Sequence, residues 1–158
     1  MSNEFNVNVG RRLGEAIAAA AVKTAAFHIQ TVAKQLVNRG RSARKIVNGK
    51  TRWAGGSTAP EPPFNFTGAL QRSIQVDNRL ATGPKPLSRV GPDNRVVPYA
   101  ARLEFGFVGT DKTGRTINQA ARPYMRRALS EGAKKAGELA RKEAVEVFRK
   151  FARSGGQA

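Results

Sequence analysis

Residues 57–76 read Ser-Thr-Ala-Pro-Glu-Pro-Pro-Phe-Asn-Phe-Thr-Gly-Ala-Leu-Gln-Arg-Ser-Ile-Gln-Val, and this stretch decides how the chain enters its sheet. Its first half contains Pro60, Pro62 and Pro63, each of which fixes φ and lacks a backbone donor. The residue before each proline is also restricted to extended geometry. The first half of the stretch is therefore predicted to be an extended arm.

The second half of the stretch changes from a turn to a strand. Thr67-Gly68 predicts a turn or helix start, where the Thr67 hydroxyl is able to cap a free N–H group. Leu70 and Ile74 are four residues apart and share one face of a short helix. From Ser73 onward apolar and polar residues alternate, which predicts a half-buried strand.

Two long helices are predicted on either side of this region, over residues 9–38 and 121–153, the second beginning near Pro123, and residues 154–158 are expected to be a flexible tail. The first helix, about 45 Å long at about 1.5 Å per residue, is long for so small a domain. Its apolar stripe is Leu13, Ile17, Ala21, Ala25, Ile29, Val32 and Leu36. The apolar stripe of the second helix is Met125, Leu129, Ala136, Leu139, Val147 and Phe151.

Residues 67–120 are predicted to form a small antiparallel sheet with turns. The expected elements are strands at Ser73–Asn78, Leu87–Val90, Phe107–Thr110 and Arg115–Ile117, turns at 82–84, 91–94 and 111–114, and a short helix at Pro98–Phe105 ended by Gly106. The predicted class is α+β, with long N-terminal and C-terminal helices packed on this sheet. No repeat divides the sequence, so residues 1–158 are expected to form one domain.

Residues 39–66 are predicted to be a long basic and proline-rich arm between the first helix and the sheet. A loop of this length is usually functional or disordered. Its cations are Arg39, Arg41, Arg44, Lys45, Lys50 and Arg52, with no acid among them. Trp53 follows them and is suited to stack on a base or to anchor the loop in a neighbour. The whole chain carries a net charge of +17, which favours an acidic or nucleic-acid partner.

Catalytic and metal-binding patterns are weak. The chain has no cysteine and one histidine, His28, which lies in mid-helix and is expected to be structural. Gly49-Lys50-Thr51 resembles the end of a phosphate-binding loop, but Arg44 stands where that loop requires glycine. No paired carboxylates suit acid–base chemistry. We therefore expect no enzyme, no metal, no cofactor and, without a long uninterrupted apolar run, no membrane partner.

Short motifs in three segments occur in a familiar order. They are Ala59-Pro-Glu-Pro-Pro with Thr67-Gly-x-Leu-x-x-Ser-Ile, then Tyr99-Ala-x-x-Leu-Glu-Phe-Gly, then Ala121-Arg-Pro-Tyr-Met-x-x-Ala-Leu. In this order they resemble the neck proteins of tailed bacteriophages, which are also described as tail-completion or head–tail joining proteins. Phe107 stands where that family commonly has threonine, Tyr124 replaces phenylalanine, and the arm lacks a glycine usual between proline and glutamate.

The resemblance implies a structural virion protein of the neck without catalytic activity. Such a protein forms a ring, with six copies favoured and twelve possible, between a head-completion or connector protein and a tail terminator or tube protein. It is made in the host cytoplasm, and packaged DNA in the lumen is a possible contact. The alternative function is a basic nucleic-acid-binding protein that contacts the DNA backbone without sequence specificity.

The resemblance also suggests roles for individual residues. Tyr99, Leu103 and Phe105 are expected in the core, and Arg122 is expected to pair with Glu104. The arm that should contact a neighbouring subunit comprises Pro60, Pro62, Pro63, Phe64 and Phe66, within Ser57–Phe66. The partner or DNA contact comprises Arg39, Arg41, Arg44, Lys45, Lys50, Arg52 and Trp53. The motif and core residues are Thr67, Gly68, Leu70, Ile74, Tyr99, Leu103, Glu104, Phe105, Gly106, Arg122 and Pro123, with Val76 also expected to be buried.

Overall fold

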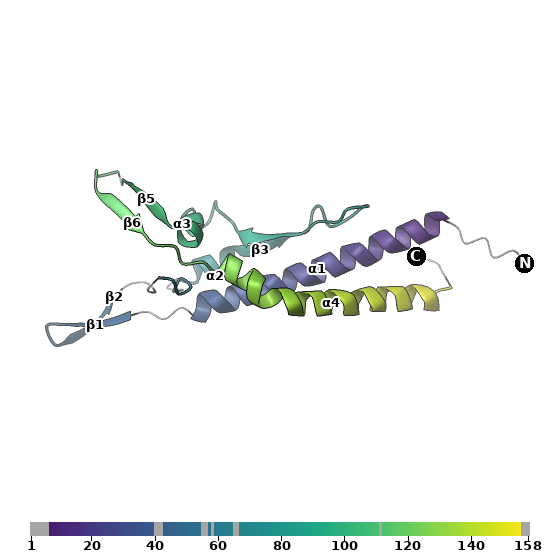
Figure 1. Ribbon diagram of the computed structural model, residues 1–158, viewed down its shortest axis with the longest axis horizontal. Helices are drawn as coiled ribbons and strands as arrows, with labels where there is room; N and C mark the ends of the chain where they lie inside the picture. The colour runs from purple at the N-terminus through teal and green to yellow at the C-terminus, as the bar shows by residue number, and fades with distance from the viewer. Residues whose placement is uncertain are drawn as a thin grey trace, which may run out of the picture. The chain divides into compact units, whose positions relative to one another are not determined.

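The computed structural model describes residues 7–39, 43–54, 57, 59–64, 67–110 and 112–155, with the backbone alone for residues 7, 43–47 and 51–54. Four helices and six strands are found in this part of the chain (Figure 1). In chain order they are α1 (Val7–Arg39), β1 (Ala43–Val47), β2 (Lys50–Ala54), α2 (Ala69–Ser73), β3 (Ile74–Asp77), β4 (Arg89–Pro92), α3 (Ala100–Phe105), β5 (Phe107–Thr110), β6 (Thr116–Gln119) and α4 (Met125–Arg153). The predicted α+β class is confirmed.

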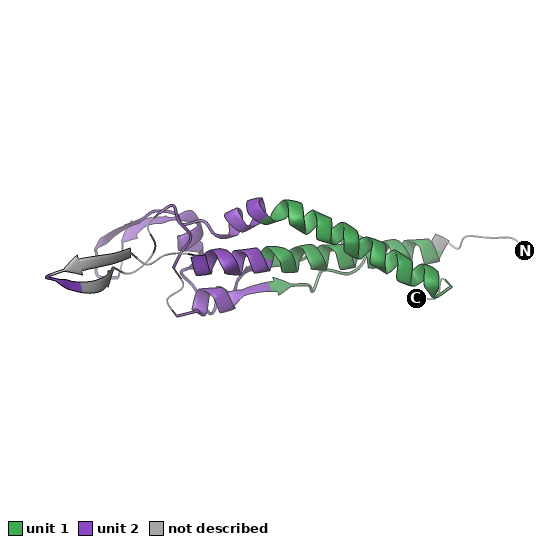
Figure 2. Ribbon diagram, turned by 90° about the horizontal axis from the view of Figure 1, so that it is seen from below, with its two compact units in different colours: residues 1–29, 76–90, 132–158 green, residues 30–75, 91–131 purple. Residues whose placement is uncertain are grey.

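The chain divides into two compact units. Unit 1 comprises residues 1–29, 76–90 and 132–158, and unit 2 comprises residues 30–75 and 91–131 (Figure 2). Both long helices contribute residues to both units, so each unit is assembled from segments far apart in sequence.

The two long helices are confirmed, with small shifts of their ends. α1 begins at Val7 and ends at Arg39, close to the predicted 9–38. α4 begins at Met125 rather than near Pro123, because Glu104 caps its first turn, as described below. Within unit 1, α1 and α4 run side by side in opposite directions (Figures 1 and 2). By length and composition, α1 from Asn8 to Arg39 also meets the criterion for a membrane span, which the core helix of a soluble protein meets too.

The predicted basic loop contains a β-hairpin that was not predicted from the sequence. β1 and β2 pair antiparallel with Val47 opposite Lys50, which leaves Asn48 and Gly49 as a two-residue turn. Both turn residues have positive φ, 53° and 68°. This is the type I′ geometry for which Asn-Gly is the preferred sequence.

The other strands also form two-stranded pairs, so the described strands make three separate ribbons rather than one sheet. β5 pairs antiparallel with β6, from Phe107 opposite Gln119 to Thr110 opposite Thr116, as predicted for that hairpin. β4 pairs with β3 but covers Arg89–Pro92 instead of Leu87–Val90. The prediction of a turn at 91–94 was therefore wrong for Gly91 and Pro92: a proline is compatible with a short edge strand, where its missing donor faces away from the partner.

Large buried side chains are concentrated in unit 2. Its core includes Leu36, Val37, Leu70, Ile74, Val97, Leu103 and Tyr124. In unit 1 the buried hydrophobic side chains among the described residues are only those of Ala26, Ala81 and Ala136. Among the large hydrophobic side chains of unit 1, some, such as Leu13, Ile17 and Phe151, are half-buried. Five are exposed, namely Phe27, Leu80, Leu87, Val145 and Phe148. In the described part of unit 1, therefore, only small apolar side chains are fully buried, and the larger ones are partly covered or exposed.

A polar bridge orders the chain that follows β3 in unit 1. The Asp77 carboxylate accepts hydrogen bonds from the Arg79 backbone N–H (3.0 Å) and from its guanidinium Nη2 (2.6 Å). The Arg79 hydrogen bonds lower the pKa of Asp77 to about 2. Both side chains lie at the surface, so the bridge fixes a turn but contributes little to stability.

Candidate functional site

The residues of two separate motifs meet at Glu104, which lies on α3 and is 5% exposed. Its carboxylate accepts hydrogen bonds from the backbone N–H groups of Tyr124 (2.8 Å), Met125 (2.9 Å) and Arg126 (3.0 Å). These groups lie at the start of α4, where no intrahelical carbonyl is available to accept from them. Glu104 therefore caps a helix from 20 residues earlier in the chain, and we call these four residues the Glu104 junction.

The electrostatics of the junction favour an ionised carboxylate. Burial raises the pKa of Glu104, but the N–H groups of Met125, Tyr124 and Arg126 and the Arg126 side chain lower it by more. The net pKa is below the ordinary value of a glutamate. The partial positive charge of a helix N-terminus acts in the same direction. Glu104 is thus suited to hold structure, and its depressed pKa does not suit a general acid or base near neutral pH.

The predicted ion pair of Glu104 with Arg122 is wrong, and Arg126 takes that place. Arg126 Nε donates to Glu104 Oε1 (3.2 Å), and its Nη2 donates to the Glu104 carbonyl oxygen (3.1 Å). Arg122 contributes through its backbone, whose N–H donates to the Leu103 carbonyl (2.7 Å). The reason is the later start of α4, which puts Arg126, rather than Arg122, in the first helical turn next to the carboxylate.

Gly106 allows the motif segments to approach closely. Its φ is 78°, and a Cβ there would lie 2.9 Å from the Gln119 carbonyl oxygen and 3.1 Å from the Ala121 backbone nitrogen. The prediction that Gly106 ends the helix is confirmed, since it is the residue directly after α3. A side chain at this position would separate β6 from the end of α3.

Two of the three aromatic and aliphatic residues predicted for the core are on the surface. Leu103 is buried as expected, but Tyr99 is 45% exposed and Phe105 is 71% exposed. The buried face of α3 is formed by Ala100, Leu103 and Glu104, at helical spacings of three and four. Tyr99 directly precedes α3, and its carbonyl oxygen accepts a hydrogen bond from the Leu103 N–H (3.1 Å).

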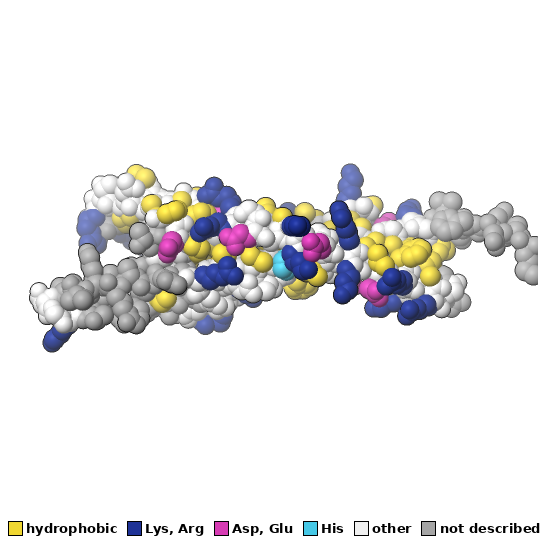
Figure 3. Space-filling model, turned by 60° about the horizontal axis from the view of Figure 1, so that its bottom comes forward, with side chains coloured by type: hydrophobic (Ala, Val, Ile, Leu, Met, Phe, Trp, Pro, Cys, Tyr) yellow, Lys and Arg dark blue, Asp and Glu magenta, His cyan; other side chains and the backbone are white. Residues whose placement is uncertain are grey.

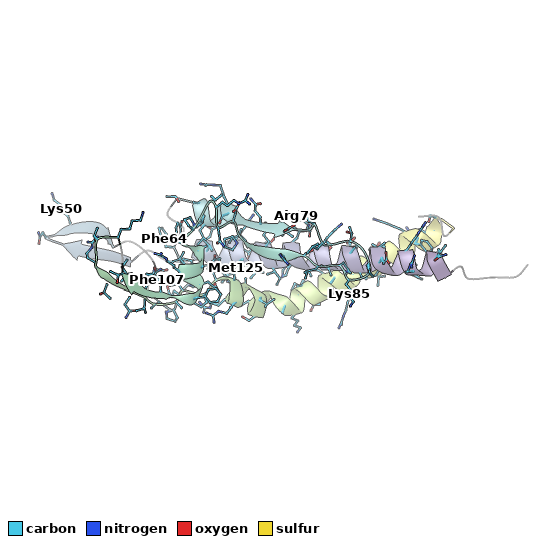
Figure 4. The ribbon with its side chains drawn as sticks, turned by 90° about the horizontal axis from the view of Figure 1, so that it is seen from above. Lys50, Phe64, Arg79, Lys85, Phe107 and Met125 are labelled. Carbon is cyan, nitrogen blue, oxygen red and sulfur yellow. The ribbon has the colours of Figure 1, made fainter. Side chains whose placement is uncertain are left out.

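Guanidinium groups cover the aromatic rings near the junction. The Arg126 guanidinium carbon lies 5.5 Å from the centre of the exposed Phe105 ring. That of Arg102 lies 4.1 Å from the centre of the Phe107 ring. Figure 4 labels Phe107 on β5 and Met125 at the start of α4. Such cation–π contacts make a surface that is both apolar and positively charged.

The Thr67–Val76 segment behaves largely as predicted. Leu70 is 4% exposed and Ile74 is fully buried, while Val76 is half-buried. The Thr67 hydroxyl accepts a hydrogen bond from the Ala69 N–H (3.3 Å). The Gln30 side chain on α1 donates to the Ile74 carbonyl oxygen (2.8 Å), which connects this segment with the helix inside unit 2.

The proline arm, which was predicted to contact a neighbouring subunit, is partly covered by its own chain. Pro62 and Pro63 are buried, whereas Pro60 is exposed and Phe64 is half-buried. Phe66 lies outside the described residues. Pro62 also lines an open hollow of about 280 Å³ together with Leu36, Arg39, Glu61, Arg127 and Glu131. Of the predicted arm residues, Pro62 and Pro63 are thus covered by their own chain, whereas Pro60 remains accessible to a neighbour.

The structure describes some of the predicted contact residues with their side chains and others by their backbone alone. Arg39 is exposed at the end of α1, with its guanidinium 3.9 Å from the Glu131 carboxylate. Lys50 is exposed beside the hairpin turn (Figure 4). Arg41 lies outside the described residues, and Arg44, Lys45, Arg52 and Trp53 are described by their backbone, in β1 and β2.

Both units expose apolar side chains as well as Lys and Arg side chains. In unit 2 they are Val96, Tyr99, Phe105, Val108 and Leu129. The predicted apolar stripe of α4 is wrong at Leu129, which is 59% exposed, because the helix buries Ala128 and Ala136 instead. On the face seen in Figure 3, apolar patches lie between Lys and Arg side chains, with fewer acidic side chains among them. Surfaces of this kind are suited to contact other macromolecules.

Metal-ligating side chains do not cluster in the described part of the chain. No group of three or more His, Asp or Glu side chains there is arranged to hold a metal ion. His28 is half-buried on α1, outside the Glu104 junction. The Glu104 junction offers capping and packing, and the nearby guanidinium groups add positive charge. In comparisons with protein-family models, curated proteins and solved structures, none matched this chain.

Proposed function

We propose that the chain is a structural protein of the phage neck, which assembles as a ring and joins the head connector to the tail tube. Its neighbours in this proposal are a head-completion or connector protein on one side and a tail terminator or tube protein on the other. The resemblance of its motifs to neck proteins suggests which assembly the chain belongs to. The exposed apolar side chains of the two units give a physical reason for it to assemble.

The observation that carries the proposal is the distribution of apolar side chains in unit 1. Its buried hydrophobic side chains, among the described residues, are alanines, while Phe27 and Phe148 are 52% and 54% exposed. Covering the exposed half of one phenylalanine contributes about 1 kcal/mol. Leu80, Leu87 and Val145 are about half exposed as well. A partner that covers all five would complete the apolar packing of unit 1.

A second copy of the chain is the partner that we propose for this surface. The α4 helix carries charges of both signs, as in the pairs Lys135–Glu138 (3.0 Å) and Arg149–Glu146 (2.9 Å). A surface of mixed sign avoids strong repulsion between identical copies. Contacts between different patches of identical subunits generate a ring when the rotation closes.

A second candidate function, non-specific nucleic-acid binding, is favoured by one observation. Residues 39–52 contain six cations and no acid. Contacts of this type go to the phosphate backbone and weaken steeply with salt. The two functions are compatible, because the lumen of a neck ring would surround DNA.

The neck proposal is tested by deleting the gene from the phage that encodes it. We expect full heads and complete tails to accumulate unjoined, and we expect the wild-type gene in trans to restore joined particles. Electron microscopy of the lysate and titration of infectious particles measure both effects. Joined, infectious particles in the absence of the protein would exclude this function.

A further inference from the structure

The register of the β1–β2 hairpin divides its cations between two faces. Lys45 is directly opposite Arg52, and Val47 is opposite Lys50. Since residues alternate between faces along a strand, positions 45, 47, 50 and 52 share one face. Three of these four positions are cations. We call them the basic face of the hairpin.

The other face is different in character. Arg44 is opposite Trp53, and Ile46 is opposite Thr51. Positions 44, 46, 51 and 53 therefore hold one cation among an aromatic, an aliphatic and a hydroxyl residue. The contrast between the faces follows from the register set by the Asn48-Gly49 turn, since a slip of one residue would exchange them.

The basic face is unfavourable for the hairpin in isolation. Lys45 and Arg52 are like charges at directly opposite positions, an arrangement that destabilises a strand pair by up to about 1 kcal/mol. Lys50 lies two positions from Arg52 on the same face, about 7 Å along the strand. No acid occurs between Arg39 and Pro60 to neutralise these charges. A polyanion that binds this face would relieve the repulsion.

We propose that the basic face of the β1–β2 hairpin, formed by Lys45, Lys50 and Arg52, binds the phosphate backbone of duplex DNA. Duplex DNA carries about one charge per 1.7 Å of its axis, dense enough to oppose all three cations at once. A protein surface rarely offers carboxylates at that density. The inference deepens the proposed function by assigning the DNA contact to one face of one hairpin, and rests on that function only for the source of the DNA.

The proposal is tested with two single variants that remove the same charge from opposite faces. Binding of the full chain to a labelled DNA duplex is measured by fluorescence anisotropy between 50 and 200 mM salt. The salt slope is the slope of the logarithm of the binding constant against the logarithm of the salt concentration. Removing one phosphate contact should lower its magnitude by about 0.9. We expect Arg52→Ala to show that decrease and a loss of affinity of roughly tenfold. Arg44→Ala removes the same charge from the other face, and we expect it to lower the affinity and the salt slope clearly less than Arg52→Ala does.

Folding is controlled within the same experiment. Arg52→Ala removes a destabilising like-charge pair, so its circular dichroism should match that of the wild type and its melting temperature should be no lower. Arg52→Lys keeps the charge and should restore binding. Equal losses in Arg44→Ala and Arg52→Ala, or no effect of either, would overturn the assignment to the basic face.

Two further measurements distinguish DNA binding by this face from binding of an acidic protein and from an effect on assembly. If polyglutamate displaces DNA as effectively as unlabelled duplex does, an acidic protein replaces DNA as the partner and the proposal fails. The mass of each variant by light scattering reports assembly independently of DNA. Loss of DNA binding with intact oligomers supports the hairpin assignment, whereas DNA binding by a strictly monomeric protein would leave the hairpin assignment standing and count against the ring.

Discussion

Glu104 and Arg126 are joined by three hydrogen bonds. Glu104 Oε1 accepts from the Arg126 backbone N–H (3.0 Å) and from its Nε (3.2 Å), and the Glu104 carbonyl oxygen accepts from Arg126 Nη2 (3.1 Å). The two residues come from different motifs, one at the end of α3 and the other in the first turn of α4. This junction fixes where α4 begins, and it keeps the exposed Phe105 ring next to the Arg126 guanidinium.

Replacing Glu104 by alanine should destabilise the protein by about 2–3 kcal/mol. The variant leaves three N–H groups at the start of α4 without their acceptor, and hydrogen bonds to a charged group are the stronger kind. Urea unfolding followed by circular dichroism measures the change. Glu138→Ala is the matched control, because Glu138 is exposed in an i,i+3 pair with Lys135 and should cost under about 0.5 kcal/mol. Equal costs for the two variants would refute the capping role.

The Glu104 junction should also make stability depend on pH in the acid range. The pKa of Glu104 is lowered on folding from a reference value of 4.5, so the folded state binds its proton less readily than the unfolded chain does. The stabilisation is fully present above that reference value and is lost as the pH falls through the folded pKa. We expect the melting temperature of Glu104→Gln to fall less than that of the wild type between pH 6 and pH 3. Parallel curves for the two proteins would contradict the assigned shift.

Gly106→Ala should destabilise the protein, whereas Gly137→Ala should stabilise it. At Gly106 a Cβ meets the Gln119 carbonyl oxygen at 2.9 Å, and φ is 78°, so a loss of about 1–3 kcal/mol is expected. Gly137 lies within α4 and a Cβ there meets nothing within 4 Å, so alanine should gain about 0.5–1 kcal/mol. Thermal unfolding of the two variants tests the opposite signs. A neutral Gly106→Ala would show that the close approach is not required.

Tyr124→Phe should cost almost nothing. The Tyr124 ring is fully buried, but its hydroxyl makes no hydrogen bond within the described residues, and burial raises the pKa of the phenol. Removing a buried polar group that lacks a partner is neutral or stabilising by about 1 kcal/mol. Tyr124→Ala, by contrast, should cost about 3–5 kcal/mol. The free energies of unfolding of the two variants show whether Tyr124 stabilises the protein by packing of its ring or by a hydrogen bond of its hydroxyl. A large loss of stability in Tyr124→Phe would reveal a partner of the hydroxyl.

The long helices were predictable from sequence because their apolar residues recur at a spacing of three and four over many turns. The β5–β6 hairpin was predictable from Asp111-Lys-Thr-Gly114 between two short apolar runs. The β1–β2 hairpin was missed because its strands are basic and lack a clear alternation of apolar residues. The signal that was present is Asn48-Gly49, the preferred type I′ turn.

The Glu104 junction was only half predictable. The motifs indicated that Glu104 meets the start of α4. Which side chain pairs with Glu104 depends on the residue at which the helix begins. A shift of two residues, from Pro123 to Met125, changed the partner from Arg122 to Arg126. The exposure of Tyr99 and Phe105 was unpredictable for a related reason, since a six-residue helix has too few turns to set its buried face by periodicity.

The central claim is that this chain forms rings by covering the apolar side chains of unit 1, and its molar mass in solution tests that claim most directly. Light scattering across a concentration series should show a species of six or twelve copies, visible as rings by negative-stain electron microscopy. Phe148→Ser should raise the midpoint concentration about tenfold, as expected for about 1.4 kcal/mol of lost contact. Lys142→Ser, exposed on the same helix, should leave the midpoint unchanged. A wild-type protein that remains a folded monomer at every concentration would contradict the claim.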